Sequence, residues 1–275
     1  MKKILLFAIF AIAVFCGCEK EDEGNSVTQD PQITLMTNKK VGETIVLRFS
    51  ENNKPTEVIG ATKISEEEID MDGGIFEAWV VDITYELTSQ TVIVKGDIAK
   101  LRCRDNGLTS LDVSKCPGLD FLQCDNNQLT MLNVSNNSEL GYLECDNNQL
   151  TQLDVSKNSH LAILSCSGNK LTSLDVSKNL ELEALFCGSN KLTSLDVSKN
   201  IKLYYLNCKH NEIKEAEMSK IIKVLPDWTG KLILYFWDYP ENYATISAVS
   251  TNSDEGNEVS EADIKIAEEK NWRFF

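Results

Sequence analysis

Cysteine is the residue type in this chain that most invites a chemical interpretation, because nine of the 275 residues are cysteines. Six of them recur at a fixed spacing of 21 residues, namely Cys103, Cys124, Cys145, Cys166, Cys187 and Cys208. Zinc sites commonly use pairs of the C-x-x-C kind, and exported proteins commonly use cysteines in disulfides. The six cysteines form no C-x-x-C pair, so we predict no metal site.

A spacing of one cysteine per repeat also argues against disulfides. If each repeat contributes one strand to a stack, equivalent residues lie about 4.8 Å apart with parallel side chains. A disulfide needs Cβ atoms about 3.8 Å apart and turned toward each other. We therefore expect six buried free thiols. Cys116 is the odd residue, because it occupies the column of Asn137, Asn158, Asn179 and Asn200 and has no evident partner.

Acid–base catalysis has little support in the sequence. The chain has only two histidines, His160 and His210, both in variable loop positions. No Ser/His/Asp grouping and no phosphate-binding loop is present. Asp112, Asp154, Asp175 and Asp196 recur once per repeat, which indicates turn chemistry rather than one acid–base pair. We predict no catalytic residue and no cofactor, and an enzyme remains only a remote alternative.

The cysteines belong to a repeated sequence motif that indicates the fold of this region. The pattern L-x-x-L-x-L-x-x-N-x-L maps onto Leu119, Leu122, Cys124, Asn127 and Leu129, with cysteine in place of the third leucine. Two further apolar columns follow it: Leu111, Leu132, Leu153, Leu174 and Leu195, and Val113, Val134, Val155, Val176 and Val197. Such repeats predict a mainly β leucine-rich-repeat solenoid with a parallel strand stack.

Period-two alternation predicts a short strand at residues 121–125, with Leu122 and Cys124 pointing inward. An asparagine follows each strand, where the chain must turn and leave backbone groups inside. These asparagines are Asn106, Asn127, Asn148, Asn169, Asn190 and Asn211. A buried amide both donates and accepts hydrogen bonds, so we assign this column a structural role rather than a binding one.

Residues 98–213 resemble the cysteine-ladder leucine-rich repeats of the internalin type. They are also similar to repeat lipoproteins on the surface of some Gram-negative bacteria, whose phrase L-T-x-L-D-V-S-x-N occurs here almost verbatim. The resemblance implies binding or adhesion without a shared ligand.

The N-terminus is typical of an exported protein. Lys2 and Lys3 precede an apolar run that is too short for a transmembrane helix, so residues 1–17 are predicted to be a signal peptide. Gly17-Cys18 resembles a lipoprotein signal in which Cys18 carries the lipid, and cleavage of an ordinary secreted protein nearby is the alternative. Residues 18–30 form an acidic tether. The resemblance implies an outer-membrane lipoprotein exposed at the cell surface.

Charge restricts the possible partners. The chain carries 42 acidic and 27 basic residues, for a net charge of −15. This charge repels nucleic acid and anionic membrane surfaces, so we expect membrane contact only through the lipid anchor. We expect a monomer that binds a protein or glycan of unknown identity.

Two flanking regions are expected to close the ends of the solenoid. Residues 31–97 read as a small β domain, with strand-like runs at Ile33–Met36, Thr44–Phe49, Trp79–Tyr85 and Thr91–Val94. The end of this region, Leu87-Thr-Ser, is similar to Leu108-Thr-Ser of the repeats, so the sequence suggests a degenerate coil before Ile98. Residues 214–275 read as an α/β cap of two longer coils, with helices from Glu215 and from Ser260 and strands at 232–237 and 272–275.

The outward strand positions form the candidate binding surface, because they differ in every repeat whereas the inward positions hardly vary. We predict that the ligand contacts the apolar residues Phe121, Tyr142, Ile163, Phe186 and Tyr205. The alternative is that these aromatics only stack along the sheet. The sequence thus predicts a non-catalytic adhesion or recognition lipoprotein, with a periplasm-facing interaction scaffold as the alternative.

Overall fold

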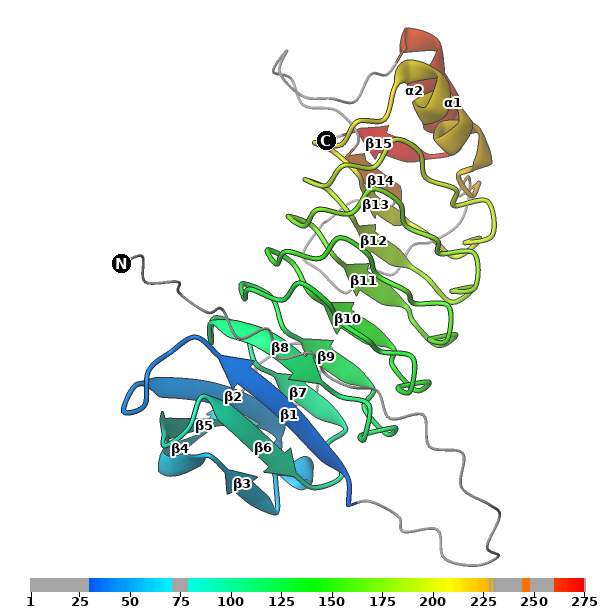
Figure 1. The fold of residues 1–275 in the computed structure, drawn as a ribbon. Helices are drawn as coiled ribbons and strands as arrows, with labels where there is room; N and C mark the ends of the chain where they lie inside the picture. The colour runs from blue at the N-terminus through cyan, green and yellow to red at the C-terminus, as the bar shows by residue number, and fades with distance from the viewer. Residues whose placement is uncertain (1–29, 71–78, 228, 230–243, 248–259, 275) are drawn as a thin grey trace, which may run out of the picture.

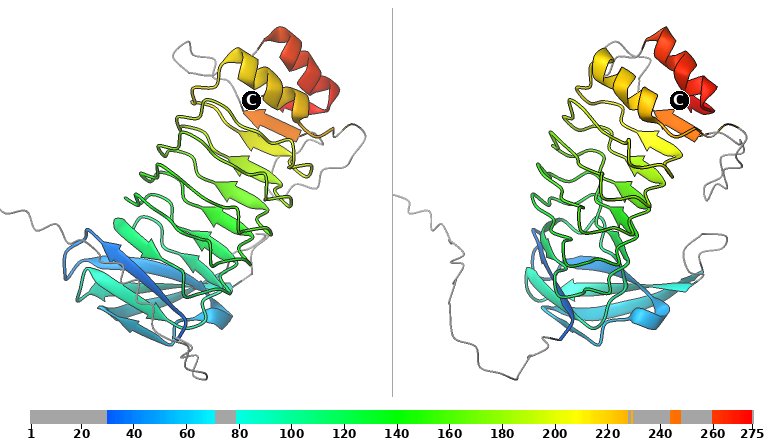
Figure 2. Two further views of the ribbon diagram at one scale, coloured as in Figure 1. Left: turned by 45° about the vertical axis from the view of Figure 1, so that its right-hand side comes forward. Right: turned by 90° about the vertical axis from the view of Figure 1, so that its right-hand side faces the viewer.

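The computed structural model describes residues 30–70, 79–227, 229, 244–247 and 260–274. Within them, a stack of coils joins an N-terminal β domain to a C-terminal α/β cap (Figure 1). Figure 2 shows from two further sides that the coils follow one another along a single axis, with both helices at the C-terminal end.

Each coil of the solenoid contributes one three-residue strand to a parallel sheet. The strands of the regular coils are β7 (Lys100–Arg102), β9 (Phe121–Gln123), β10 (Tyr142–Glu144), β11 (Ile163–Ser165), β12 (Ala184–Phe186) and β13 (Tyr205–Asn207). Each residue pairs with the one 21 positions later, as Leu143 does with Leu164. The inward leucines and all six repeat cysteines are fully buried. The chain is a β solenoid of the leucine-rich-repeat kind, as the sequence predicts.

Two rows of buried asparagines tie each coil to the preceding one. In the first row, Asn148 accepts a hydrogen bond from Leu129 N and donates to the carbonyl oxygens of Cys124 and Cys145. In the second row, Asn158 donates to the carbonyl oxygens of Val134 and Asn137, and Asn179 and Asn200 repeat this arrangement. The first row confirms the structural role predicted from the sequence. The second row was not predicted, and Cys116 stands at its beginning.

A left-handed backbone position explains another column of small polar residues. Asp105, Asn126, Asn147, Gly168, Ser189 and His210 have φ angles of 52° to 67°. Asparagine, aspartate, histidine and glycine tolerate this conformation better than other residues do. His210 therefore occupies a turn position that the coil geometry requires in every repeat.

The N-terminal domain is a β sandwich fused to the first coil. Its strands are β1 (Gln32–Thr37), β2 (Thr44–Ser50), β3 (Glu57–Ile59), β4 (Ala61–Asp70), β5 (Trp79–Leu87) and β6 (Thr91–Lys95), with a 3-10 turn, η1, at Glu51–Asn53. Strand β2 pairs antiparallel with β7, so the sheet of the solenoid continues without a break through β2 and β5 to β4. The second sheet has the order β3-β6-β1-β8, where β8 (Leu108–Asp112) belongs to the first coil.

Two features of this domain differ from the sequence prediction. Strands β3 and β4 were missed, and residues 62–68 of β4 are all exposed on the outermost strand of the sheet. Charged residues on an edge strand prevent pairing with other chains but mask the strand pattern. The predicted degenerate coil before Ile98 is wrong, because β2 pairs directly with β7 and takes the place of a preceding coil.

The C-terminal cap consists of two longer coils. Strands β14 (Ala244–Ser247) and β15 (Trp272–Phe274) extend the parallel sheet beyond β13. Helices α1 (Glu215–Val224) and α2 (Glu261–Glu269) replace the extended outer segments of the regular coils. Ser260 caps α2 by accepting a hydrogen bond from Asp263 N, as predicted. The predicted strand at 232–237 lies outside the described residues.

Candidate recognition surface

The outward side of the strand stack is here called the strand face, and its side chains form three columns. The first and second columns start at Lys100 and Arg102, the first and last residues of β7, and the third starts at Arg104, two residues further on. The predicted ligand contacts Phe121, Tyr142, Ile163 and Tyr205 lie in the first column, whereas Phe186 lies in the second column, in register with Ser165 and Asn207. The structure divides these five residues into two groups. Phe121 and Tyr142 are only 3% and 7% exposed, whereas Ile163, Phe186 and Tyr205 are half-buried. The expectation that all five are open to solvent is therefore wrong for the first two.

The aromatic residues form two stacked pairs across neighbouring strands. The rings of Phe121 and Tyr142 lie 4.4 Å apart between centroids, and those of Phe186 and Tyr205 lie 4.5 Å apart. Phe121 and Tyr142 are register partners, so strand spacing alone places their rings together, whereas Phe186 and Tyr205 are diagonal neighbours on adjacent strands. Stacking stabilises the sheet in both cases. The first pair thus has a structural role, and the second pair keeps surface that a ligand can reach.

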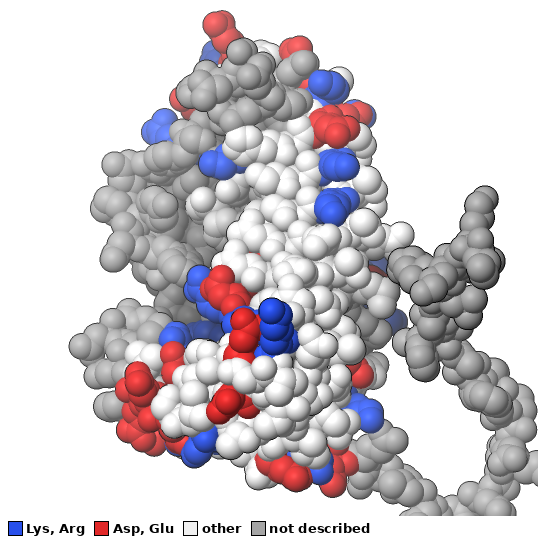
Figure 3. Space-filling view, turned by 60° about the vertical axis from the view of Figure 1, so that its left-hand side comes forward, with Lys and Arg blue, Asp and Glu red and all other residues white. Residues whose placement is uncertain are grey.

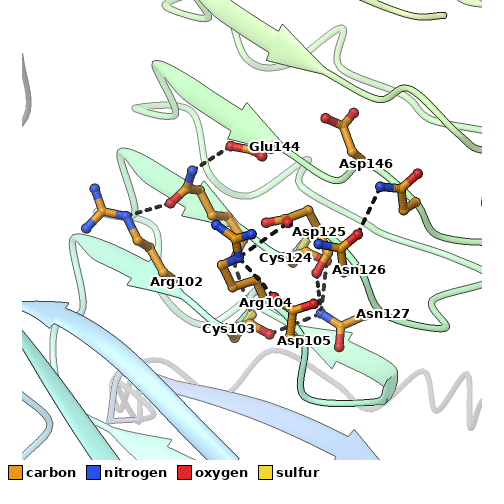
Figure 4. A network of polar contacts seen from close by, with 12 residues as sticks. Arg102, Cys103, Arg104, Asp105, Cys124, Asp125, Asn126, Asn127, Glu144 and Asp146 are labelled. Carbon is orange, nitrogen blue, oxygen red and sulfur yellow. Dashed lines mark hydrogen bonds and ion pairs between the residues drawn. The ribbon is translucent and has the colours of Figure 1, made fainter.

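A chain of polar contacts runs along the second column, from the first coil to the third (Figure 4). Arg102 donates from Nε to Gln123 Oε1 at 2.5 Å, and Gln123 Nε2 donates to Glu144 Oε2 at 2.5 Å. The hydroxyl of Tyr142 donates to the same oxygen of Glu144 at 2.8 Å. The guanidinium carbon of Arg102 also lies 4.7 Å from the centroid of the Phe121 ring. These contacts hold the four side chains in fixed orientations.

Two aspartates of the third column are shielded from solvent, Asp125 almost completely and Asp146 in part. Asp125 is 3% exposed, its Oδ2 lies 3.6 Å from Arg104 Nε, and its Oδ1 has no hydrogen-bond partner. Burial, and secondarily the charge of Glu144, raise the pKa of Asp125 above its usual range. Asp146 accepts hydrogen bonds from Ser165 Oγ at 2.6 Å and Ser167 N at 2.5 Å. Burial nevertheless raises the pKa of Asp146 to about 6.

The distribution of charge differs along the molecule. On the side seen in Figure 3, acidic and basic side chains gather where the N-terminal domain meets the solenoid, and the middle of the solenoid carries few charges. The polar chain from Arg102 to Glu144 belongs to the first three coils, the first of which pairs with strand β2 of the N-terminal domain. The stacked pair Phe186 and Tyr205 lies farther along the strand face, in coils whose neighbouring outward positions are Ser165, Ser167 and Gly188.

The cysteines do not contribute to the surface. Every cysteine in the described part of the chain is a buried free thiol, including Cys116, whose sulfur lies 3.7 Å from Gly96 O. Burial raises the pKa of each of the six repeat thiols, so they stay protonated. No group of histidine, cysteine, aspartate or glutamate side chains within the described ranges could hold a metal ion. Cys18 lies outside those ranges.

No helix among the described residues has both the length and the apolar character needed to cross a membrane. In the first 29 residues, which contain the predicted signal peptide, the lipidation site and most of the tether, the structure describes nothing.

Comparisons with known proteins find similar solved structures but no closer relatives. No protein-family model matches the chain, and no curated protein matches it either. An internalin, InlF, from Listeria monocytogenes has 18% identity over 64% of this chain and 46% of its own, with a TM-score of 0.47. The functional domain of InlJ from the same species, which includes a cysteine ladder, has 24% identity over 67% of this chain and 50% of its own, with a TM-score of 0.30.

A leucine-rich-repeat protein of Leptospira interrogans has 22% identity over 59% of this chain and 38% of its own, with a TM-score of 0.41. This chain thus spans half or less of the length of each of the three structures.

Proposed function

We propose that this protein is a non-catalytic recognition protein that binds a protein or glycan ligand through its strand face. The observation that carries the proposal is the contrast between the two sides of each strand. Inward positions repeat leucine and cysteine in every regular coil and are fully buried. Outward positions differ in every coil, yet Ile163, Phe186 and Tyr205 expose apolar surface there. Packing within the coil requires the inward residues, whereas Ile163 and Phe186 lie outside the buried core and Tyr205 packs against it while staying partly exposed.

The stacked pair Phe186 and Tyr205 is the proposed anchor, because both rings are only half-buried and are held against each other at 4.5 Å. Rigid aromatic side chains with some open surface are frequent binding hot spots. Truncating such an anchor often weakens binding by about 1–2 kcal/mol or more. Phe121 and Tyr142 are not proposed as anchors, since they are buried.

The test begins with a screen of host proteins and glycans against the purified protein, followed by titration of the ligand that binds. The double substitution Phe186→Ser with Tyr205→Ser should weaken binding at least about tenfold. The matched control is Leu180→Ser with Ile201→Ser, which removes two side chains that are 53% and 72% exposed in the turns before β12 and β13. Unchanged binding by the strand-face variant, with an unchanged melting temperature, would refute the proposed site.

We further propose that lipid on Cys18 anchors the protein at the outer face of the outer membrane. The support is the sequence Gly17-Cys18 after an apolar run, followed by an acidic segment. The Cys18→Ala variant should lose both the lipid and processing at this position. Protease treatment of intact cells should degrade the wild-type protein, and protection would instead support a periplasm-facing scaffold.

A further inference from the structure

A small hollow lies on the strand face where the N-terminal domain meets the first coil. Three half-buried cationic side chains surround it: Arg48 from β2, and Lys100 and Arg102 from β7. Its floor is apolar, because Phe49, Val80 and Phe121 are at most 4% exposed. The hollow therefore concentrates positive charge on a chain whose net charge is −15.

The two arginines differ in how their charge is satisfied. Arg48 forms a two-pronged ion pair with Asp82, in which NH2 lies 2.7 Å from Oδ2. Arg102 instead contacts the neutral amide of Gln123 and the ring of Phe121. Among the residues that the structure describes, no carboxylate lies within ion-pairing distance of Arg102. Burial and the charge of Arg48 lower the pKa of Arg102, and the more distant charges of Asp82 and Glu144 only partly oppose this.

The orientation of the Arg102 side chain is set by its neighbours. Gln123 must present its oxygen to Arg102 and its nitrogen to Glu144, since arginine only donates hydrogen bonds and an ionised glutamate only accepts them. This contact occupies Nε of Arg102. The edge of the guanidinium that carries NH1 and NH2 can still donate hydrogen bonds to a ligand. The spacing of these two nitrogens fits the two oxygens of a carboxylate.

We propose that Arg102 binds the carboxylate of an aspartate or glutamate side chain of a protein ligand, received end-on through NH1 and NH2 at this hollow. The inference rests on the proposed function of ligand recognition by the strand face and adds a chemical requirement to it. The ligand would span from Arg102 on β7 toward Phe186 on β12, with a charged contact at one end and an apolar contact at the other.

The size of the hollow favours a side-chain carboxylate over a sugar acid. The space in it that the centre of a water-sized group can occupy is about 10 Å³, which fits about one such group, for example a carboxylate oxygen, and is too little for a sugar ring. No open aromatic face for sugar stacking lies beside it, because Arg102 and Tyr142 already cover the Phe121 ring. The net negative charge of the chain disfavours polyanionic glycans as well.

The test uses small probes and needs no natural ligand. The full-length protein, ¹⁵N-labelled in detergent, is titrated with acetyl-Ala-Glu-Ala-amide, with acetyl-Ala-Gln-Ala-amide and with methyl glucuronide, while the Nε–H signals of arginine are followed by NMR. The glutamate peptide should shift the Arg102 signal in a saturable way, and the glutamine peptide should not. Equal shifts with both peptides, or equal shifts at Arg102 and Arg104, would refute the site. A tighter response to methyl glucuronide would refute the assignment to a protein carboxylate.

Three variants complete the test, with the backbone amides of Phe121 and Gln123 as reporters. Arg102→Gln should weaken the glutamate peptide about tenfold or more. Gln123→Glu keeps Arg102 but supplies an internal carboxylate, so it should weaken the peptide to a similar degree. Arg104→Gln removes a cation that Asp105 already pairs with at 3.0 Å, and should leave the affinity within about twofold.

If Arg102→Gln fails to fold, Gln123→Glu decides the outcome, and full affinity in that variant would refute the proposal. If the glutamate peptide does not bind at Arg102, but the substitutions Phe186→Ser and Tyr205→Ser still weaken binding of the natural ligand, only this inference is overturned. The reverse result would overturn the apolar anchor and leave the carboxylate site standing.

Discussion

The side chain of Asn106 bonds to the backbone of Val46 as a neighbouring strand residue would. Its Oδ1 accepts from Val46 N at 3.0 Å, and its Nδ2 donates to Val46 O at 2.7 Å. In later coils the equivalent asparagine bonds to the backbone of the preceding coil, as Asn148 does with Cys124 O. The first coil has no preceding coil, so Asn106 binds strand β2 and joins the N-terminal domain to the solenoid.

Asn106→Ala should therefore lower the free energy of unfolding by about 2–4 kcal/mol, because it leaves both polar groups of Val46 without their partner. Urea denaturation followed by circular dichroism would measure the change. The control is Asn133→Ala, which removes an exposed amide that accepts only from Ser135 N, and should cost less than about 0.5 kcal/mol. Equal effects of the two substitutions would contradict the special role of Asn106.

The second asparagine row gives a sharper electrostatic test. Asn158 donates to Val134 O at 3.0 Å and to Asn137 O at 2.7 Å, while its own Oδ1 has no partner. Asn158→Asp replaces the donor by an acceptor that faces two carbonyl oxygens in the core. It should destabilise the protein more than Asn158→Ala does, by about 2 kcal/mol or more. Thermal unfolding of both variants at pH 7 would show which is less stable. An Asp variant as stable as the Ala variant would contradict the predicted repulsion between the carboxylate and the two carbonyl oxygens.

The two aromatic pairs should respond differently to truncation. Phe121→Ala removes a ring that is 3% exposed and should cost about 3–5 kcal/mol of unfolding free energy. Phe186→Ala removes a half-buried ring and should cost only about 1–2 kcal/mol. Denaturant titration of the two variants would measure this difference. Similar costs would indicate that Phe186 also serves mainly to hold the sheet together.

Asp146 makes the stability depend on pH. Its pKa in the folded protein is about 6, above its ordinary value of 3.8, so the folded state binds a proton more tightly than the unfolded state does. The stabilisation from this proton is complete below about pH 4 and is lost as the pH rises through 6. Asp146→Asn should remove a decline on the order of 2–3 kcal/mol over this window. Unfolding measured from pH 4 to 7 would reveal the flatter profile, and unchanged profiles would show that another group is responsible.

The six repeat thiols should resist alkylation in the folded protein. Burial raises the pKa of Cys208 to about 12, and the other five are raised by burial as well, so almost no thiolate is present at pH 8. Iodoacetamide labelling followed by peptide mass spectrometry should modify these cysteines only after unfolding in urea. Rapid labelling, or a disulfide between any two of them in native protein, would contradict their placement in the core.

The repeated sequence was sufficient to predict the solenoid and the residues that line its interior. Leu122 and Cys124 follow from period-two alternation, and Asn127 follows from the need to satisfy backbone groups where the strand ends. Both are local requirements that recur at every coil, so the repetition itself reveals them. The cap helix from Glu215 is likewise visible as an apolar face at helical spacing.

The parts that escaped the sequence depend on contacts between distant segments. Nothing near Asn106 indicates that it bonds to Val46, 60 residues earlier, because the partner is set by the insertion of β2 beside β7. Phe121 and Tyr142 were expected to be exposed because they alternate outward. They are buried instead, because their rings stack on each other and Arg102 lies over the Phe121 ring. Strand β4 was missed because its charged, exposed residues 62–68 carry no alternating pattern.

The amino-acid sequence by itself thus determined the coil, its core and the role of the first asparagine column, since each is a short-range pattern repeated many times. Only the tertiary structure decided which outward residues keep open surface and which cation lacks a counter-charge. Phe186 differs from Phe121, and Arg102 from Arg48, through neighbours that come from other coils and from the N-terminal domain. The burial of a side chain and its ion pairing depend on contacts between coils and with the N-terminal domain, so they cannot be read from the sequence of a single repeat.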